Sequence, residues 1–210
     1  VDPELMYSMP KGLTAATGMD ALTHAIESYI TPGAWVMSDM FELKAIEMIA
    51  QNLKAAVDNG KDVAAREAMS QAQYIAGMGF SNVGLGIVHS MAHPLGAFYD
   101  TPHGVANALL LPYVMEYNAE SPAAPKYIHI AKAMGVDTTG MSEAEGVKAA
   151  VEAVKALSAS INIPQKLHEI NVKEEDIPAL AVAAFNDVCT GGNPRPTSVA
   201  DIEALYRKAF

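Results

Sequence analysis

The amino-acid sequence predicts an all-α fold. Half of the 210 residues are hydrophobic, with 12 methionines and only 7% aromatic residues, a composition that suits packed helices better than twisted sheets. Apolar side chains recur at spacings of three and four, whereas Val, Ile and Thr never line up in period two as strands require. We expect one helical domain over 1–210. A division into two helical sub-bundles, at about 1–120 and 121–210, is a further option.

The first expected helix runs from about Ala15 to Ile30. Residues 1–13 before it are irregular because Pro and Gly interrupt them, and Thr-Pro-Gly at 31–33 ends it. A second helix follows an N-cap at Ser38-Asp39 and ends at Asn59-Gly60. Apolar residues at helical spacing mark the inner faces of both helices: Met19, Leu22, Ile26, Tyr29, Ile46, Ile49, Leu53 and Val57.

Asp62 is expected to cap a third helix. The glycines of segment 77–86 either let helices approach closely or allow a turn near Ser81-Asn82. The histidine-bearing helix after this segment is expected to kink or end just before Pro94, because proline lacks the backbone donor and clashes with the preceding turn. A further helix is expected from Val105 to about Asn118.

The second half of the chain predicts four more helices. Ser142 with Glu145 forms a capping-box pattern ahead of an apolar stripe that reaches Leu157. The four helices are expected at 126–134, from 142 to about 157, at 176–188 and at 198–209.

No apolar run in the chain reaches the roughly 18 residues of a membrane helix.

Charge and cysteine content exclude several functional classes. The formal net charge is −10 with no Lys/Arg cluster, which argues against nucleic-acid binding. The single cysteine, Cys189, excludes an internal disulfide framework and favours a reducing compartment, so we expect a cytoplasmic protein with no membrane partner. The first residues, VDPELMYSMP, lack an initiator Met and a signal-peptide pattern, so we expect the chain to be cut from a longer polypeptide.

Four residues in two motifs form a candidate metal site. Asp20 and His24, in GMDALTHAIE, lie one helical turn apart, and His89 and His103 come from HSMAHPLGAFYDTPHG. One carboxylate and three imidazoles suit a divalent metal such as Fe(II), Zn(II), Mn(II), Co(II) or Ni(II), with one position open. Each part also has a simpler explanation: a surface hydrogen bond between Asp20 and His24, a core histidine at His89, and a polar residue at a helix start for His103. All three explanations must hold at once for the metal site to be dismissed.

Neighbouring residues leave alternatives open. His93, four residues after His89, either completes the metal shell or transfers protons beside it, as suits an imidazole with a pKa of about 6.5. Glu27 either hydrogen-bonds a metal ligand or is solvated. Asp100 is a weaker candidate ligand, because the turn before Pro102 is expected to use its side chain.

Cys189 lies in DVCTGGNPRP without a local histidine that would act as its base. We therefore favour a small apolar residue that lines a core or pocket over a nucleophile. The segment 191–194 predicts a turn. GLG at 84–86 is not a phosphate cradle, because no strand precedes it and the full glycine spacing is missing.

The segments GLTAATGMDALTHAIESY, GMGFSNVGLGIVHSMAHPLGAFYDTPHGVANALLLP and DVCTGGNPR together resemble the iron-containing (group III) alcohol dehydrogenases. The similarity covers essentially the whole chain and is greatest to the lactaldehyde reductase, or propanediol oxidoreductase, branch. The resemblance implies a two-domain enzyme whose N-terminal α/β domain holds NAD(P). The present chain resembles the helical C-terminal half, and it has no glycine-rich dinucleotide loop of its own.

The resemblance also implies roles for particular residues. Asp20, His24, His89 and His103 match the family's iron ligands. His93 matches the histidine near the nicotinamide and is the expected catalytic and cofactor-binding residue. Phe80 and Cys189 match positions that face the small substrate.

The expected activity is the interconversion of lactaldehyde and 1,2-propanediol, or of a similar short aldehyde and alcohol. The expected partners are this small substrate and the N-terminal domain, and a homo-oligomer is left open. Two other functions fit the ligand set: a metal-dependent hydrolase, and a non-catalytic metal-binding domain if the chain is a natural truncation. The adjacent His-Asp pair of many helical phosphohydrolases is absent, which counts against the first.

Overall fold

The computed structural model describes residues 1–210 and contains helices but no strands, which confirms the all-α prediction. The hydrophobic core is one cluster of 49 buried residues to which every α-helix contributes. The division into two sub-bundles stays a prediction. The α-helices are α1 (Lys11–Ile30), α2 (Val36–Asp58), α3 (Val63–Val83), α4 (Ile87–Tyr99), α5 (His103–Asn118), α6 (Tyr127–Ala133), α7 (Glu143–Ser160), α8 (Ile177–Phe185) and α9 (Val199–Ala209).

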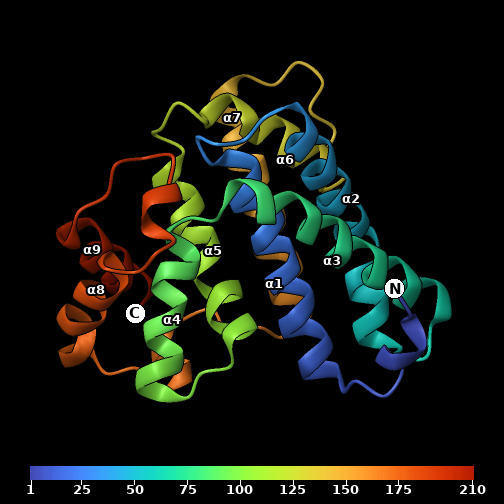
Figure 1. Cartoon of the computed structure of the whole chain (residues 1–210), viewed down its shortest axis with the longest axis horizontal. Helices are drawn as coiled ribbons and strands as arrows, with labels where there is room; N and C mark the ends of the chain where they lie inside the picture. The colour runs from blue at the N-terminus through green and yellow to red at the C-terminus, as the bar shows by residue number, and fades with distance from the viewer.

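The helices form two groups that α5 joins (Figure 1). Helices α1, α2 and α3 pack on one another on one side, and on the other side α8 packs on both α4 and α9. Helix α5 contacts both α1 and α4, while α6 and α7 pair with each other at the top of the view. The ends of α4 and α5 that carry histidines therefore face the middle of α1. No helix is long and apolar enough to cross a membrane.

Several predicted helix boundaries are wrong, and tertiary packing explains the largest error. Helix α4 does not end before Pro94 but continues to Tyr99. Met91, Pro94 and Leu95 are buried, and the packing of α4 against α5 and α8 outweighs the one backbone hydrogen bond that proline cannot donate. A rule that considers only the residues next to Pro94 does not include the burial of this helical turn.

Of the two options for the glycines of 77–86, the turn at Ser81-Asn82 does not form, because α3 continues to Val83 and ends at Gly84, whose φ of +83° favours glycine. Helix α8 ends at Phe185, which leaves the following residues in a loop instead of a helix. Helix α1 begins earlier than predicted, at Lys11. The caps at Asp62 and Ser142 are confirmed, whereas the predicted cap at Ser38-Asp39 is wrong because α2 begins at Val36, after Trp35.

Two glycines lie at close contacts between helices. Gly104, in the first turn of α5, faces the backbone of α1, and a Cβ at this position would lie 2.3 Å from the carbonyl oxygen of Ala16. Similarly, a Cβ at Gly79 of α3 would lie 1.8 Å from Oε1 of Glu42 on α2. Gly104 therefore fixes an interhelical distance that alanine would increase, whereas alanine at Gly79 would displace the side chain of Glu42.

Glu42 is fully buried, and neither of its carboxyl oxygens has a hydrogen-bond partner. Burial raises the pKa of Glu42 to about 8, against about 4.3 for an unfolded glutamate. The folded chain therefore holds the proton of Glu42 more tightly than the unfolded chain does. This contribution to the free energy of unfolding is present in full at acidic pH. This contribution is lost as pH rises from the unfolded pKa through the folded one, by at most about 1.4 kcal/mol per pH unit.

The variant Glu42→Gln, which stays uncharged, is expected to lack this part of the pH dependence. The melting temperature of the variant minus that of the unsubstituted chain should increase as pH rises from about pH 5 to pH 8. Thermal unfolding by circular dichroism at several pH values measures the difference. Equal pH profiles for the two chains would contradict the buried-acid interpretation.

Candidate metal centre

Asp20, His89 and His103 converge from three helices onto one place, and His24 lies beside them. Asp20 and His24 lie on α1, His89 on α4, and His103 is the first residue of α5. Oδ1 of Asp20 lies 3.4 Å from Nε2 of His103 and 3.8 Å from Nε2 of His89. Ligand atoms of these three residues all lie within 4.8 Å of one another.

His24 completes the arrangement from the side of α1. Its Nε2 lies 3.1 Å from Nε2 of His89, and its Nδ1 lies 3.9 Å from Oδ2 of Asp20. Burial, with the nearby His89, lowers the pKa of His24 to about 4, so its imidazole is neutral at neutral pH. A neutral imidazole is the form that binds metals.

Glu27 determines which nitrogen His89 offers. Both side chains are only 2% exposed, and Oε2 of Glu27 lies 2.5 Å from Nδ1 of His89. The other carboxylate oxygen accepts the backbone N–H of Val88 at 2.7 Å. Burial lowers the pKa of His89, but the hydrogen bond and charge of Glu27 outweigh it and raise the pKa. With Nδ1–H held by Glu27, Nε2 is the nitrogen that faces Asp20 and His24. Of the two alternatives for Glu27, the structure favours the ligand-orienting one.

Asn107, one turn after His103 on α5, was not predicted as a site residue. Its amide Nδ2 donates to Oδ1 of Asp20 at 2.6 Å and lies 3.0 Å from Nε2 of His103. The side chain is fully buried, and its Oδ1 has no hydrogen-bond partner. This amide aligns the carboxylate and the imidazole toward each other. An Asn four residues after a candidate ligand on one helical face was the available sequence signal.

The donor set fits a divalent transition metal. A cation with bonds of about 2.1 Å holds neighbouring ligand atoms about 3.0–3.4 Å apart. The distance of 3.4 Å between Asp20 and His103 and that of 3.1 Å between the two Nε2 atoms of His24 and His89 are close to this range. One carboxylate oxygen with imidazole nitrogens suits iron or zinc better than calcium or magnesium.

His93 lies beside this cluster and is more exposed, with 42% of its side chain accessible. Its ring stacks on that of His103, with centroids 5.4 Å apart and an interplanar angle of 16°. Its Nδ1 lies 2.7 Å from Oδ2 of Asp187, in the loop after α8. This pairing was not predicted, and only the position of Asp187 two residues before Cys189 in the DVCTGG motif hinted at it.

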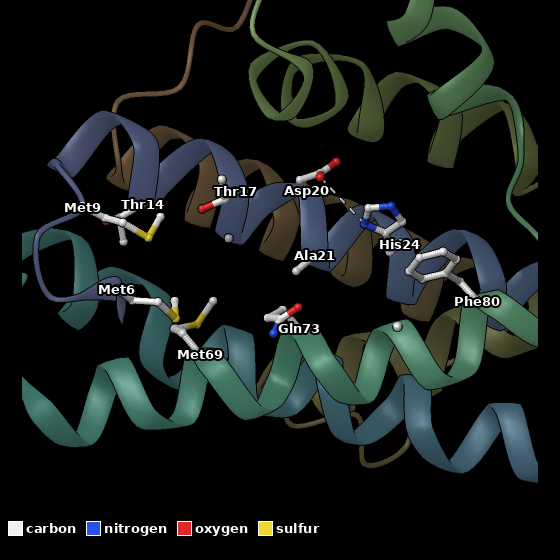
Figure 2. A pocket seen from close by; sticks show the side chains of 12 residues that line it. Met6, Met9, Thr14, Thr17, Asp20, Ala21, His24, Met69, Gln73 and Phe80 are labelled. Atoms are coloured by element: carbon white, nitrogen blue, oxygen red, sulfur yellow. Dashed lines mark ion pairs between the residues drawn. The ribbon is translucent and has the colours of Figure 1, made fainter. Parts of the chain in front are cut away.

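Phe80 and Cys189, the two residues expected to face the substrate, occupy different places. Phe80, on α3, stacks on His24 with ring centroids 4.4 Å apart. Together with Asp20 and His24 it lines a cavity of about 440 Å³ between α1 and α3 (Figure 2).

Cys189 lies outside that cavity, and its backbone N–H donates to Asp187. Burial and the charge of Asp187 raise the pKa of the Cys189 thiol to about 12, so it stays a neutral thiol. Asp100 ends α4 in the left-handed conformation and is exposed, outside the cluster.

Comparison with known proteins matches this chain to one family. The model of the Fe-containing alcohol dehydrogenase family, C-terminal, matches residues 14–210. Lactaldehyde reductase of Escherichia coli K12 is 59% identical over all 210 residues of the chain, which cover 54% of that protein. The 1,3-propanediol dehydrogenase of Klebsiella pneumoniae is 47% identical over 209 residues, again with 54% of its length covered.

Solved structures show the same fold. A crystal structure of a 1,3-propanediol oxidoreductase has a TM-score of 0.98 and 47% identity, and the match covers 100% of the present chain and 55% of that one. The alcohol dehydrogenase from Oenococcus oeni has a TM-score of 0.97 and 41% identity, covering 100% and 54% of the two chains. The chain thus spans about half the length of the relatives it matches.

Proposed function

Because this chain belongs to the Fe-containing alcohol dehydrogenase family, we propose that it is the metal-binding half of a two-domain, NAD(P)-dependent alcohol dehydrogenase. The proposed metal is Fe(II), held by Asp20, His24, His89 and His103. The convergence of Asp20, His89 and His103 from three helices, with His24 in contact with His89, is the observation that carries the proposal. A metal-dependent hydrolase is not favoured, since the similar proteins are oxidoreductases.

The proposed reaction interconverts lactaldehyde and 1,2-propanediol, or a similar short aldehyde and alcohol. The similarity to lactaldehyde reductase supports lactaldehyde and 1,2-propanediol as the substrate pair. The similarity to 1,3-propanediol dehydrogenase supports a similar short aldehyde and alcohol. NAD(P) is proposed to bind an N-terminal domain that covers the half of the relatives beyond this chain. We propose the cytoplasm as the compartment, in keeping with a lone cysteine that is a neutral thiol.

When bound, the metal supplies a Lewis acid at the substrate oxygen, and the nicotinamide supplies or accepts a hydride. The residues of this chain position these groups. Glu27 fixes the ring of His89, and Asn107 fixes the carboxylate of Asp20. Phe80 covers His24 on the side of the cavity between α1 and α3 and limits access of water there.

His93 is proposed to move the proton of the reaction. Reduction of an aldehyde adds a hydride at carbon and a proton at oxygen, and oxidation of the alcohol reverses both steps. Because Nδ1 of His93 is engaged by Asp187, its Nε2 is the nitrogen free to exchange a proton with the substrate oxygen. The exposure of His93 gives that proton a route to solvent.

His103→Ala in the full-length enzyme tests the metal role. We expect lactaldehyde-dependent NADH oxidation to fall by more than about 100-fold, beyond the 10–100-fold typical of residues that only orient a ligand. The matched control is His168→Ala, an exposed histidine whose Nδ1 bonds the carbonyl of Phe210 instead. A His103→Ala enzyme with the rate of the control would contradict the proposal.

A further inference from the structure

Asp187 links the loop after α8 to the histidine beside the metal centre. Its Oδ2 lies 2.7 Å from Nδ1 of His93, on α4. Its Oδ1 accepts the backbone N–H of Cys189 at 2.9 Å and lies 3.5 Å from the hydroxyl of Ser90. The two carboxylate oxygens therefore have separate partners: Oδ1 faces the Cys189 backbone and Ser90, and Oδ2 faces His93.

The partners of Asp187 keep it ionised. Burial raises the pKa of Asp187, but the hydrogen bonds from the Cys189 backbone and from His93 outweigh that effect and hold it below its usual range. An ionised carboxylate only accepts hydrogen bonds. Nδ1 of His93 must therefore carry a hydrogen, which leaves the lone pair of a neutral ring on Nε2.

We propose that Asp187 is the positioning residue that holds His93 in the Nδ1–H tautomer, with its Nε2 lone pair directed to the substrate oxygen. In alcohol oxidation, the proton of the alcohol oxygen passes to Nε2 while the hydride passes to NAD(P)⁺, and Nε2 later releases the proton to solvent. Asp187 stays ionised throughout and balances the imidazolium charge. This inference rests on the proton-transfer role of His93 proposed above.

The geometry distinguishes this role from mere packing, because Asp187→Asn should reverse the tautomer. The oxygen of the new amide must take the place of Oδ1, since an NH₂ group there would oppose the N–H of Cys189. The NH₂ group then faces Nδ1 of His93, which can pair with it only as an acceptor. The hydrogen of the neutral ring moves to Nε2, which loses the lone pair that the reaction requires.

The test reads the tautomer directly. The ring nitrogens of His93 are assigned by 15N NMR in the 210-residue chain, both metal-free and loaded with Zn(II) as a diamagnetic metal. We expect Nδ1–H in the unsubstituted chain and Nε2–H in Asp187→Asn. Asp58→Asn is the matched control, because Asp58 is an exposed carboxylate paired only with Lys54, and it should keep Nδ1–H.

The second measurement is a kinetic assay of the full-length enzyme. Asp187→Asn should lower kcat by about 100-fold or more, within the range of general acid–base catalysis, while metal content and the KM for aldehyde stay within a few-fold. An unchanged tautomer in Asp187→Asn, or an unchanged kcat beside a reversed tautomer, overturns the inference. Because the tautomer needs neither turnover nor bound metal, its failure is distinct from failure of the proposed function, which would appear as an unsubstituted enzyme without metal or activity.

Discussion

Removing the metal from the metal-loaded chain is expected to lower its melting temperature by about 5–10 °C. A ligand held at 100 times its dissociation constant stabilises the folded state by about 2.7 kcal/mol, and each kcal/mol shifts the melting temperature of a chain this size by about 2–4 °C. The effect arises because Asp20, His89 and His103 lie on α1, α4 and α5, so that one cation joins both helix groups.

The measurement is differential scanning calorimetry before and after chelation, followed by addition of excess Fe(II) under anaerobic conditions. Asp20→Asn is the control, because a chain that binds the metal about 100-fold more weakly should lose little stability on chelation. Ca²⁺ should not restore the transition, since imidazole nitrogens are poor ligands for it. Identical transitions with and without metal would show that the four side chains do not hold a cation jointly.

Gly104→Ala is expected to destabilise the fold and to weaken metal binding together. The added methyl group would lie 2.3 Å from the carbonyl oxygen of Ala16, a backbone atom that cannot turn aside. Helices α1 and α5 must then separate, at a cost of about 1–3 kcal/mol typical of overpacking. Because His103 adjoins Gly104 and Asp20 lies one turn from Ala16, the distance of 3.4 Å between the two ligand atoms should increase.

Gly12→Ala provides the matched control within α1. A Cβ at Gly12 meets no atom within 4 Å, so alanine there should be neutral or slightly stabilising, as its helix propensity predicts. Thermal unfolding and metal titration of both variants compare the two sites. A Gly104→Ala chain with the stability and metal affinity of Gly12→Ala would contradict the close contact of α1 and α5.

The sequence predicted the all-α class and most of its helices because those signals are local. Caps at Asp62 and Ser142 each depend on a few neighbouring residues, and both hold in the structure. Pro94 shows where local rules fail. Burial of its helix against α5 and α8 is a property of residues far away in the chain, and it overrides the proline penalty.

The residues of the candidate site also divide into those that local motifs predicted and those that depend on contacts between distant parts of the chain. The four proposed ligands were found because two motifs contain them, and their convergence is now a matter of geometry while their metal role remains a proposal. Glu27 was ambiguous, since nothing local distinguishes a solvated glutamate from one that is 2% exposed against His89. Asn107 and Asp187 were missed because their contacts, to Asp20 and His93, span 87 and 94 residues of sequence.

The most direct test of the central claim is the metal stoichiometry of this chain. Anaerobic titration with Fe(II), checked by elemental analysis after removal of free metal, should give one metal per chain for the unsubstituted protein. Asp20→Asn should bind at least about 100-fold more weakly, beyond the loss expected for a residue that only orients a ligand. One tightly bound metal in Asp20→Asn, or none in the unsubstituted chain, would contradict a metal centre built from Asp20, His24, His89 and His103.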